Sequence, residues 1–137
     1  MNVGQIMTRH PICVLANNSV RQALRMMLEH DIRHLPVLDN EELVGIVTDK
    51  DVHGFIIPTV DALDNPEGAK KRLETRVSEI MESDPTTVEL EDDVPHAIEV
   101  MLDERVGALA VVDPHTGKLE GIVSYVDVLR AAAPLLA

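Results

Sequence analysis

The sequence of 137 residues has almost no aromatic side chains: one Phe (Phe55), one Tyr (Tyr125) and no Trp. Hydrophobic residues nevertheless make up 45% of the chain, so Val, Leu, Ile, Ala and Met must fill any core. Branched aliphatic side chains stabilise a fold through close packing, because none of them buries the area of an aromatic ring. We therefore expect a globular protein with a densely packed aliphatic core, organised as one domain or as two half-domains.

Cysteine, basic residues and long apolar runs are also scarce. The single cysteine, Cys13, excludes an internal disulfide and suits a reducing compartment, so we expect a cytoplasmic protein. No run approaches the roughly 20 apolar residues of a membrane helix, and no secretory signal is visible, so no membrane partner is expected. The formal charge of −12 argues against a nucleic-acid surface but still allows a local site for a small nucleotide.

The motifs of common catalytic and metal sites are missing as well. There is no Gly-x-x-x-x-Gly-Lys loop, Gly-x-Ser-x-Gly elbow or His-Glu-x-x-His pair. His30 and His34 are four residues apart, but Pro36 and a strand pattern place His34 beyond the helix, so the two histidines do not share a helix face. We expect no catalytic residues, no catalytic cofactor and no metal, and hence a protein that is not an enzyme.

What the sequence does contain is an internal repeat with an offset of 74 residues. The recurring positions are mostly apolar. They include Val3, Met7, Val20, Met27, Leu35, Val37 and Gly45-Ile46-Val47, which return as Val77, Met81, Val94, Met101, Leu109, Val111 and, after a two-residue insertion, Gly121-Ile122-Val123. Self-similarity at a fixed offset indicates two copies of one structural unit. We therefore divide the chain into repeat 1 (1–57), a linker (58–75) and repeat 2 (76–137).

Each copy predicts the same short series of elements. One helix face is formed by Val20, Ala23, Leu24, Met27 and Leu28, and its counterpart by Val94, Ala97, Ile98, Met101 and Leu102. A short strand precedes this helix, and two apolar runs separated by turn residues follow it as a hairpin. A second helix starts near Asp49 and near Tyr125. The fold class is therefore α/β (α+β), with two β-α-β-β-α units packed about a pseudo-twofold axis.

Both copies place a hydroxyl and a carboxylate at the start of the second helix, as Thr48-x-x-Asp51 and Ser124-x-x-Asp127. This spacing matches a helix capping box, which needs no ligand. It also suits a nucleotide, because a carboxylate accepts hydrogen bonds from ribose hydroxyls and a helix start favours phosphate. The two roles can coexist.

These residues resemble the tandem cystathionine-beta-synthase (CBS) domain pair, or Bateman module. The resemblance rests on Ile6-Met7 before Pro11, on Leu35-Pro36-Val37, on Gly45 to Val52, and on the corresponding residues of copy two. It implies a module that binds AMP, ADP, ATP or S-adenosylmethionine in clefts between the repeats. It also implies a homodimer stacked through helices.

The resemblance assigns a role to each candidate site residue. Thr48 and Ser124 would bind phosphate or ribose oxygen, and Asp51 and Asp127 the ribose hydroxyls. The residues expected to line adenine or phosphate are Thr8, Cys13, Thr87, Arg33 and His34, with Ile46 and Ile122 packing on the base. The two copies differ, because Arg33-His34 has Gly107-Ala108 as its counterpart, and Thr8-Arg9-His10 has Glu82-Ser83-Asp84. We therefore expect one strong nucleotide site and one that is weak or empty.

The function that follows is regulatory. We expect a sensor of adenosine-containing nucleotides that acts in trans on an unknown effector protein, or through self-association. An alternative is a scaffold that keeps the fold and binds no ligand. A weaker alternative is a divalent-cation binder or hydrolase that uses acidic clefts.

Overall fold

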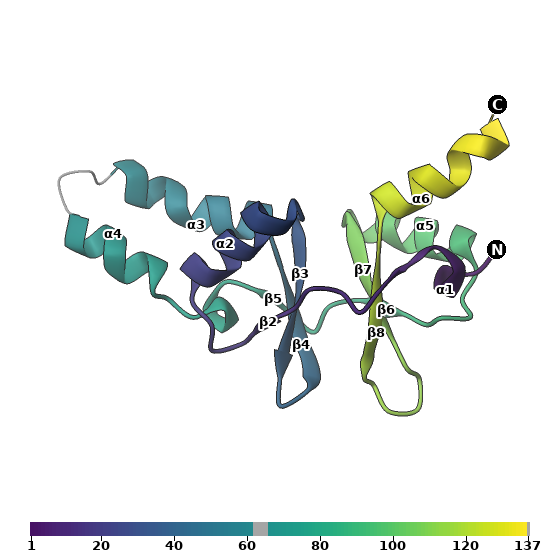
Figure 1. Ribbon diagram of the computed structural model, residues 1–137, viewed down its shortest axis with the longest axis horizontal. Coiled ribbons are helices and arrows are strands. Elements are labelled where there is room, and N and C mark those ends of the chain that lie inside the picture. The colour runs from purple at the N-terminus through teal and green to yellow at the C-terminus, as the bar shows by residue number, and fades with distance from the viewer. Residues whose placement is uncertain (62–65, 137) are drawn as a thin grey trace. The chain divides into compact units, whose positions relative to one another are not determined.

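A computed structural model describes residues 1–61 and 66–136 of the chain, with side chains placed outside 57–61 (Figure 1). The chain forms two compact units, one from a continuous segment and one from two separate segments, and neither coincides with a sequence repeat. The first is Ile12–Asp84, called here the Thr48 unit. The second combines Met1–Pro11 with Pro85–Ala137 and is called the Ser124 unit. Each unit therefore consists of most of one repeat and a short segment that precedes the other repeat's first long helix.

The Thr48 unit contains a four-stranded sheet with the strand order β2-β3-β4-β5. Strand β2 is parallel to β3, and the other neighbours are antiparallel. The strands are β2 (Val14–Leu15), β3 (His34–Asp39), β4 (Glu42–Thr48) and β5 (Glu82–Ser83). The helices are α2 (Val20–His30), α3 (Asp49–Asp61), α4 (Pro66–Leu73) and the 3-10 helix η1 (Val77–Glu79).

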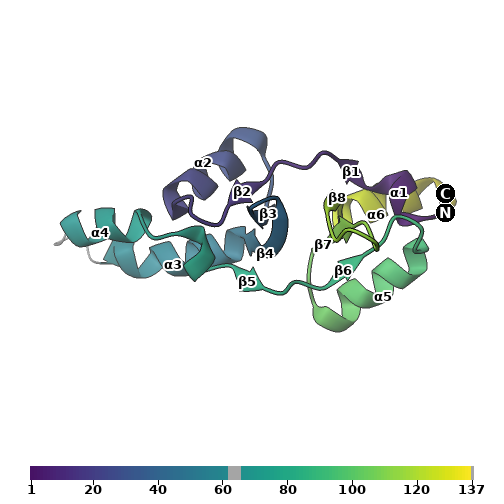
Figure 2. The ribbon, with the colours of Figure 1, turned by 90° about the horizontal axis from the view of Figure 1, so that it is seen from below.

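The Ser124 unit repeats this topology with the strand order β1-β8-β7-β6. Its strands are β1 (Thr8–Arg9), β6 (Thr87–Val88), β7 (Ala108–Val112) and β8 (Leu119–Ser124). Its helices are α1 (Val3–Ile6), α5 (Val94–Glu104), α6 (Tyr125–Ala132) and the 3-10 helix η2 (Ala133–Leu136). Figure 2 shows edge strand β1 beside β8, and edge strand β5 beside β4.

The predicted β-α-β-β-α order is confirmed in both copies, and the second helices begin at Asp49 and Tyr125 as expected. The edge strands β1 and β5 and the short helices before them were not predicted. A strand of two residues has no alternating pattern that the sequence could reveal. The chain passes between the units at Pro11–Ile12 and at Asp84–Pro85, and His10 and Asp84, close to these two points, both have a φ of 49°.

The segment expected to be a linker, 58–75, is largely helical in the part that the structure describes. Helix α3 continues to Asp61, and α4 follows at Pro66. The Arg72 guanidinium lies over the Phe55 ring, 4.3 Å from its centroid, and Arg72 Nε donates a hydrogen bond of 2.9 Å to the Phe55 carbonyl. Helix α4 is therefore packed against α3. The boundaries 1–57, 58–75 and 76–137 stay a prediction from sequence similarity.

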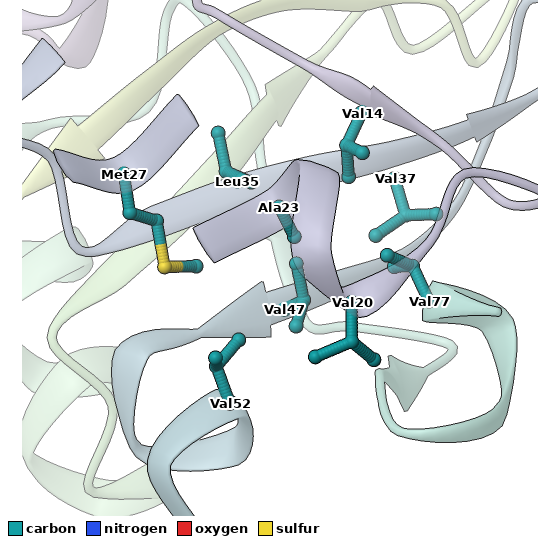
Figure 3. Packing of buried hydrophobic residues seen from close by; sticks show 9 residues of the cluster. All are labelled: Val14, Val20, Ala23, Met27, Leu35, Val37, Val47, Val52 and Val77. Atoms are coloured by element: carbon teal, nitrogen blue, oxygen red, sulfur yellow. The ribbon is translucent and has the colours of Figure 1, made fainter. Parts of the chain in front are cut away.

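Each unit has its own aliphatic core, and each core includes residues from the exchanged segment. The core of the Thr48 unit consists of Val14, Val20, Ala23, Met27, Leu35, Val37, Val47, Val52 and Val77 (Figure 3). The core of the Ser124 unit consists of Val3, Met7, Val88, Ala97, Met101, Leu109, Val111 and Val123. Burying one such side chain contributes about 1.5–3 kcal/mol, so the exchanged residues are part of what stabilises each unit.

Two leucines of the predicted apolar helix faces are exposed. Leu28 is 73% exposed and Leu102 is 71% exposed, so these two members of the faces lie outside the cores. Position i+8 lies about 80° around a helix from position i, which places it at the border of an apolar stripe. The predicted cap of α2 is confirmed, since Gln22 N donates to Ser19 Oγ at 3.1 Å.

A glycine in each motif strand meets the exchanged segment without room for a side chain. A Cβ on Gly121 would lie 2.7 Å from the Thr8 carbonyl oxygen, and one on Gly45 would lie 2.7 Å from the Glu82 carbonyl oxygen. Both oxygens belong to backbone, which cannot rotate away. The absence of a Cβ therefore permits the close approach of β1 to β8 and of β5 to β4.

We predict that Gly45→Ala and Gly121→Ala each lower the free energy of unfolding by about 1–3 kcal/mol, because overpacking forces the edge strand outward. Urea denaturation monitored by circular dichroism measures this change. Gly54→Ala in α3 is the matched control, since no atom lies within 4 Å of the added Cβ, and we expect it to be neutral or stabilising. A Gly45→Ala protein as stable as the Gly54→Ala protein would contradict the prediction.

Candidate functional site

The Thr48–Asp51 motif forms a reciprocal cap at the junction of β4 and α3. Thr48 N donates to Asp51 Oδ2 at 2.9 Å, and Asp51 N donates to Thr48 Oγ1 at 3.2 Å. Both residues are half-buried. The two bonds hold the carboxylate against the first turn of the helix, where the N–H groups of Asp49, Lys50 and Asp51 all donate to acceptors within the protein.

The Ser124–Asp127 motif repeats this arrangement at the junction of β8 and α6. Ser124 N donates to Asp127 Oδ2 at 2.9 Å, and Asp127 N donates to Ser124 Oγ at 3.3 Å. The capping interpretation is therefore confirmed at both motifs. Asp51 and Asp127 accept these bonds through Oδ2, and each carboxylate has a second oxygen that can accept hydrogen bonds from a ligand.

The strand registers bring further candidate residues to the same sheet face as each motif. In the Thr48 unit, His34 is paired with Thr48, and Glu82 with Ile46. The core residues Leu35 and Val47 alternate with these positions and lie on the opposite face. We call the face that carries His34, Ile46, Thr48 and Glu82, away from the core, the site face of the Thr48 unit.

In the Ser124 unit, the same register forms a row across all four strands. Thr8 pairs with Ile122, Ile122 with Ala110, and Ala110 with Thr87. The core residues Leu109 and Val123 alternate with this row, so the row and Ser124 make up the site face of this unit. Thr8 and Thr87 end the row three strand spacings apart, or about 14 Å, so one hydrogen-bonding group of a ligand cannot contact both.

Of two further predicted residues in the Thr48 unit, one lies beside its motif and the other lies at an edge of the sheet. The carbonyl oxygen of Arg33 accepts a 2.9 Å hydrogen bond from Asp49 N, which places Arg33 beside the start of α3. Cys13 precedes β2, the outer strand on the other side of the sheet from β5. It is half-buried, and burial raises the pKa of its thiol. Cys13 therefore lies at the far edge of the sheet from Glu82.

The edge strands are exchanged between the sequence repeats, which corrects one grouping. Thr8, Arg9 and His10 were grouped with Arg33-His34, and Glu82 to Asp84 with Gly107-Ala108. The structure places Thr8–His10 with Gly107-Ala108 in the Ser124 unit, and Glu82–Asp84 with Arg33-His34 in the Thr48 unit. Each unit thus combines one cationic and one non-cationic segment. The expectation of one strong and one weak site stays a prediction, but this grouping no longer supports it.

His34 has a pKa that its surroundings in the Thr48 unit shift from its ordinary value. Burial lowers the pKa of His34 below its ordinary value of 6.5, and the Arg33 guanidinium acts in the same direction. The carboxylates of Asp49 and Asp51 oppose this shift. Its counterpart Ala108 is buried and carries no charge. The two units therefore present the same backbone junction with different polarity.

Sequence reasoning missed Asp49 and Glu82 as neighbours of the Thr48–Asp51 motif. Asp49 follows Thr48 directly and could have been found from the helix start, whereas Glu82 carries no local signal.

Across residues 1–61 and 66–136, no three or more His, Cys, Asp or Glu side chains are arranged to hold a metal ion. None of the helices in these ranges has the length and apolarity needed to cross a bilayer.

Comparisons with known proteins agree with the two-unit fold. Residues 3–57 and 77–134 each match the sequence profile of the CBS domain. The chain is 34% identical over 129 residues to a 33.4 kDa protein of Thermofilum pendens from a ribosomal RNA operon, and it spans only 43% of that protein.

Two similar crystal structures contain adenosine-type ligands. The CBS domain pair of protein MJ0100, in complex with 5′-methylthioadenosine and S-adenosyl-L-methionine, is 26% identical with a TM-score of 0.80, and 98% of each chain is covered. CBSX2, an Arabidopsis thaliana protein, in complex with AMP is 29% identical with a TM-score of 0.79, and 99% of this chain and 98% of that chain are covered. Both similarities cover whole CBS pairs.

We predict that His34 makes stability depend on pH. Because its folded pKa is depressed, the folded protein binds fewer protons than the unfolded chain just below pH 6.5. Its contribution to the free energy of unfolding is therefore complete above that pH and is lost as the pH falls toward the folded pKa. His34→Gln is expected to lose less stability than the wild type between about pH 7 and about pH 5.

Urea denaturation at a series of pH values measures this difference. His96→Gln, which changes an exposed histidine in the first turn of α5, is the control and should keep the wild-type pH dependence. If His34→Gln and the wild type lose stability in parallel, His34 is not the group responsible.

Proposed function

Because this chain belongs to the CBS domain family, we propose that it is a regulatory module that binds an adenosine-containing ligand at its two hydroxyl–carboxylate motifs. The observation that carries this proposal is the duplicated junction itself. Thr48–Asp51 and Ser124–Asp127 have the same hydrogen bonds at the same strand-to-helix junction, on the sheet face away from each core. Structurally similar CBS pairs bind AMP, 5′-methylthioadenosine and S-adenosylmethionine.

The chemistry of the motif suits ribose in particular. Asp51 and Asp127 each use Oδ2 for the cap, and Oδ1 is then positioned to accept hydrogen bonds from the ribose hydroxyls. The neighbouring Ile46 and Ile122 provide an apolar surface for the base. In the Thr48 unit the Arg33 guanidinium supplies the positive charge that a phosphate requires. The ligand is accordingly an adenine nucleotide (AMP, ADP or ATP) or S-adenosylmethionine, and its location in clefts between the repeats stays a prediction.

Regulation would follow from linkage, and no chemical step is involved. A ligand that binds the folded protein and prefers one of its conformations shifts the population toward that conformation. An effector protein in trans, or a second copy of the chain, would then respond to the difference. We place this module in the cytoplasm.

A ligand-free scaffold is the second candidate, and one observation favours it. Both capping boxes are complete without any ligand, so the motifs already have a structural role. The scaffold hypothesis predicts that the carboxylates matter for stability only. The sensor hypothesis predicts that they also matter for binding.

We predict that AMP raises the melting temperature of the protein, because a ligand at about 100 times its Kd adds about 2.7 kcal/mol to the stability of the native state. Asp51→Asn and Asp127→Asn each keep an oxygen that accepts the cap hydrogen bond but remove the negative charge. Each is therefore expected to melt near the wild-type temperature without AMP and to show a smaller shift with AMP. Differential scanning fluorimetry measures both quantities.

The alanine variants are the matched comparison. Asp51→Ala and Asp127→Ala also remove the oxygen that accepts the hydrogen bond from Thr48 N or Ser124 N, which costs about 1 kcal/mol, so they should melt earlier with or without AMP. The scaffold hypothesis replaces the sensor if AMP, ADP, ATP and S-adenosylmethionine all leave the wild-type melting temperature unchanged. It also gains support if the Asn variants respond to AMP as the wild type does.

We also propose that the protein forms a homodimer through α2 and α5. Leu28 and Leu102 occupy equivalent positions of these helices and are 73% and 71% exposed. A single exposed leucine needs no explanation, but the same exposed position in both repeats gives each unit an apolar surface of the same kind. Contact of these helices with a second copy would bury the exposed leucines.

Leu28→Glu combined with Leu102→Glu is therefore expected to convert a dimer into a monomer without changing the circular dichroism spectrum, since both side chains lie outside the cores. Sedimentation velocity at several concentrations measures the mass. Lys118→Glu in the β7–β8 turn is the control and should leave the dimer intact. A wild-type protein that is monomeric at every concentration would overturn the proposal.

A further inference from the structure

In both units a methionine sulfur lies against the bare Cα of the glycine in the motif strand. A Cβ on Gly121 would lie 2.7 Å from Met7 Sδ, and one on Gly45 would lie 2.5 Å from Met81 Sδ. The same two glycines are also approached by the next carbonyl oxygen of the exchanged segment. The contact therefore joins each motif strand to a segment that precedes the other repeat's first long helix.

Each methionine stands directly before a two-residue edge strand. Met7 precedes β1, and Met81 precedes β5. A valine four residues earlier, Val3 or Val77, is fully buried, so one helical turn directs both side chains into the same core. A two-residue strand makes few ladder hydrogen bonds, so its position depends on these side-chain anchors.

The edge strand in turn carries residues of the site face. Thr8 in β1 pairs with Ile122, two residues before Ser124. Glu82 in β5 pairs with Ile46, two residues before Thr48. A displacement of the methionine therefore moves Thr8 or Glu82 relative to the motif on the neighbouring strand.

We infer that Met7 and Met81 are positioning residues, each for the motif of the other repeat: Met7 for Ser124–Asp127, and Met81 for Thr48–Asp51. The inference rests on the proposed function, because those motifs are where the ligand is detected. Methionine suits this role, since its unbranched thioether fits the narrow space over a glycine. Leucine has a similar volume and should substitute for it, whereas valine or alanine leaves a gap.

The test uses two proteins in which only one motif keeps its carboxylate. Asp51→Asn leaves the Ser124–Asp127 motif, and Asp127→Asn leaves the Thr48–Asp51 motif. Met7→Val is expected to weaken AMP binding about fivefold in the Asp51→Asn protein and to leave it unchanged in the Asp127→Asn protein. Met81→Val should give the reverse pattern, and Met→Leu should restore binding to within about twofold in each case. Isothermal titration calorimetry with AMP, below the melting temperature of every variant, measures the affinities.

If the methionines had only a structural role, their replacement would weaken AMP binding equally in both backgrounds. It could also change the melting temperature with no selective change in AMP affinity. Either result overturns the inference. The inference also fails if Met7→Val weakens AMP binding at the Thr48–Asp51 motif, which belongs to the same repeat as Met7.

Hydrogen exchange provides a readout that does not depend on AMP. Met7→Val should raise the exchange of the β1 and β8 amides and leave those of β4 and β5 unchanged, with the opposite result for Met81→Val. If the wild type binds no AMP, the proposed ligand is wrong and the exchange pattern alone decides whether the methionines hold these strands. Unchanged exchange in β1 and β8 refutes the inference even where AMP binds.

Discussion

The structure depends on one constraint: neither repeat can complete its own sheet or core from its own residues. The outer strand beside β4 comes from residues 82–83, and the one beside β8 comes from residues 8–9. Val77 and Val3, both fully buried, accompany these strands into the cores. Because each unit is closed by a segment from beyond its own repeat, a change in either segment affects the unit that holds the other repeat's motif.

The same carboxylates connect stability to recognition. Asp51 and Asp127 complete the capping boxes of their helices through Oδ2, which keeps each side chain fixed before any ligand arrives. A fixed carboxylate loses little conformational freedom when it accepts further hydrogen bonds, so the cap prepares the binding group in advance. A motif of this kind is useful to a scaffold and to a sensor, and the isosteric Asn substitutions separate the two because they change charge while keeping the cap acceptor.

The two units have the same fold but differ in the side chains that lie around their motifs. Arg33, His34 and Asp49 surround the motif of one unit, whereas Gly107, Ala108 and Tyr125 occupy the equivalent positions of the other. The exchange of edge strands partly offsets this difference, because Arg9 joins the second set and Glu82 the first. Which unit better accommodates a negatively charged ligand therefore depends on the segments that share a sheet. The position of a residue within its repeat does not determine this preference.

The sequence by itself determined the features that local periodicity and caps encode. The 74-residue repeat, the helix faces of α2 and α5, the hairpins, and the hydroxyl–carboxylate motifs all follow from residues close together in the chain. Only the tertiary structure decided the edge strands and their exchange, because β1 and β8 lie more than a hundred residues apart and two residues carry no alternating pattern. It also decided that Leu28 lies outside the core, since a residue at the border of an apolar stripe is buried only if a neighbouring element covers it.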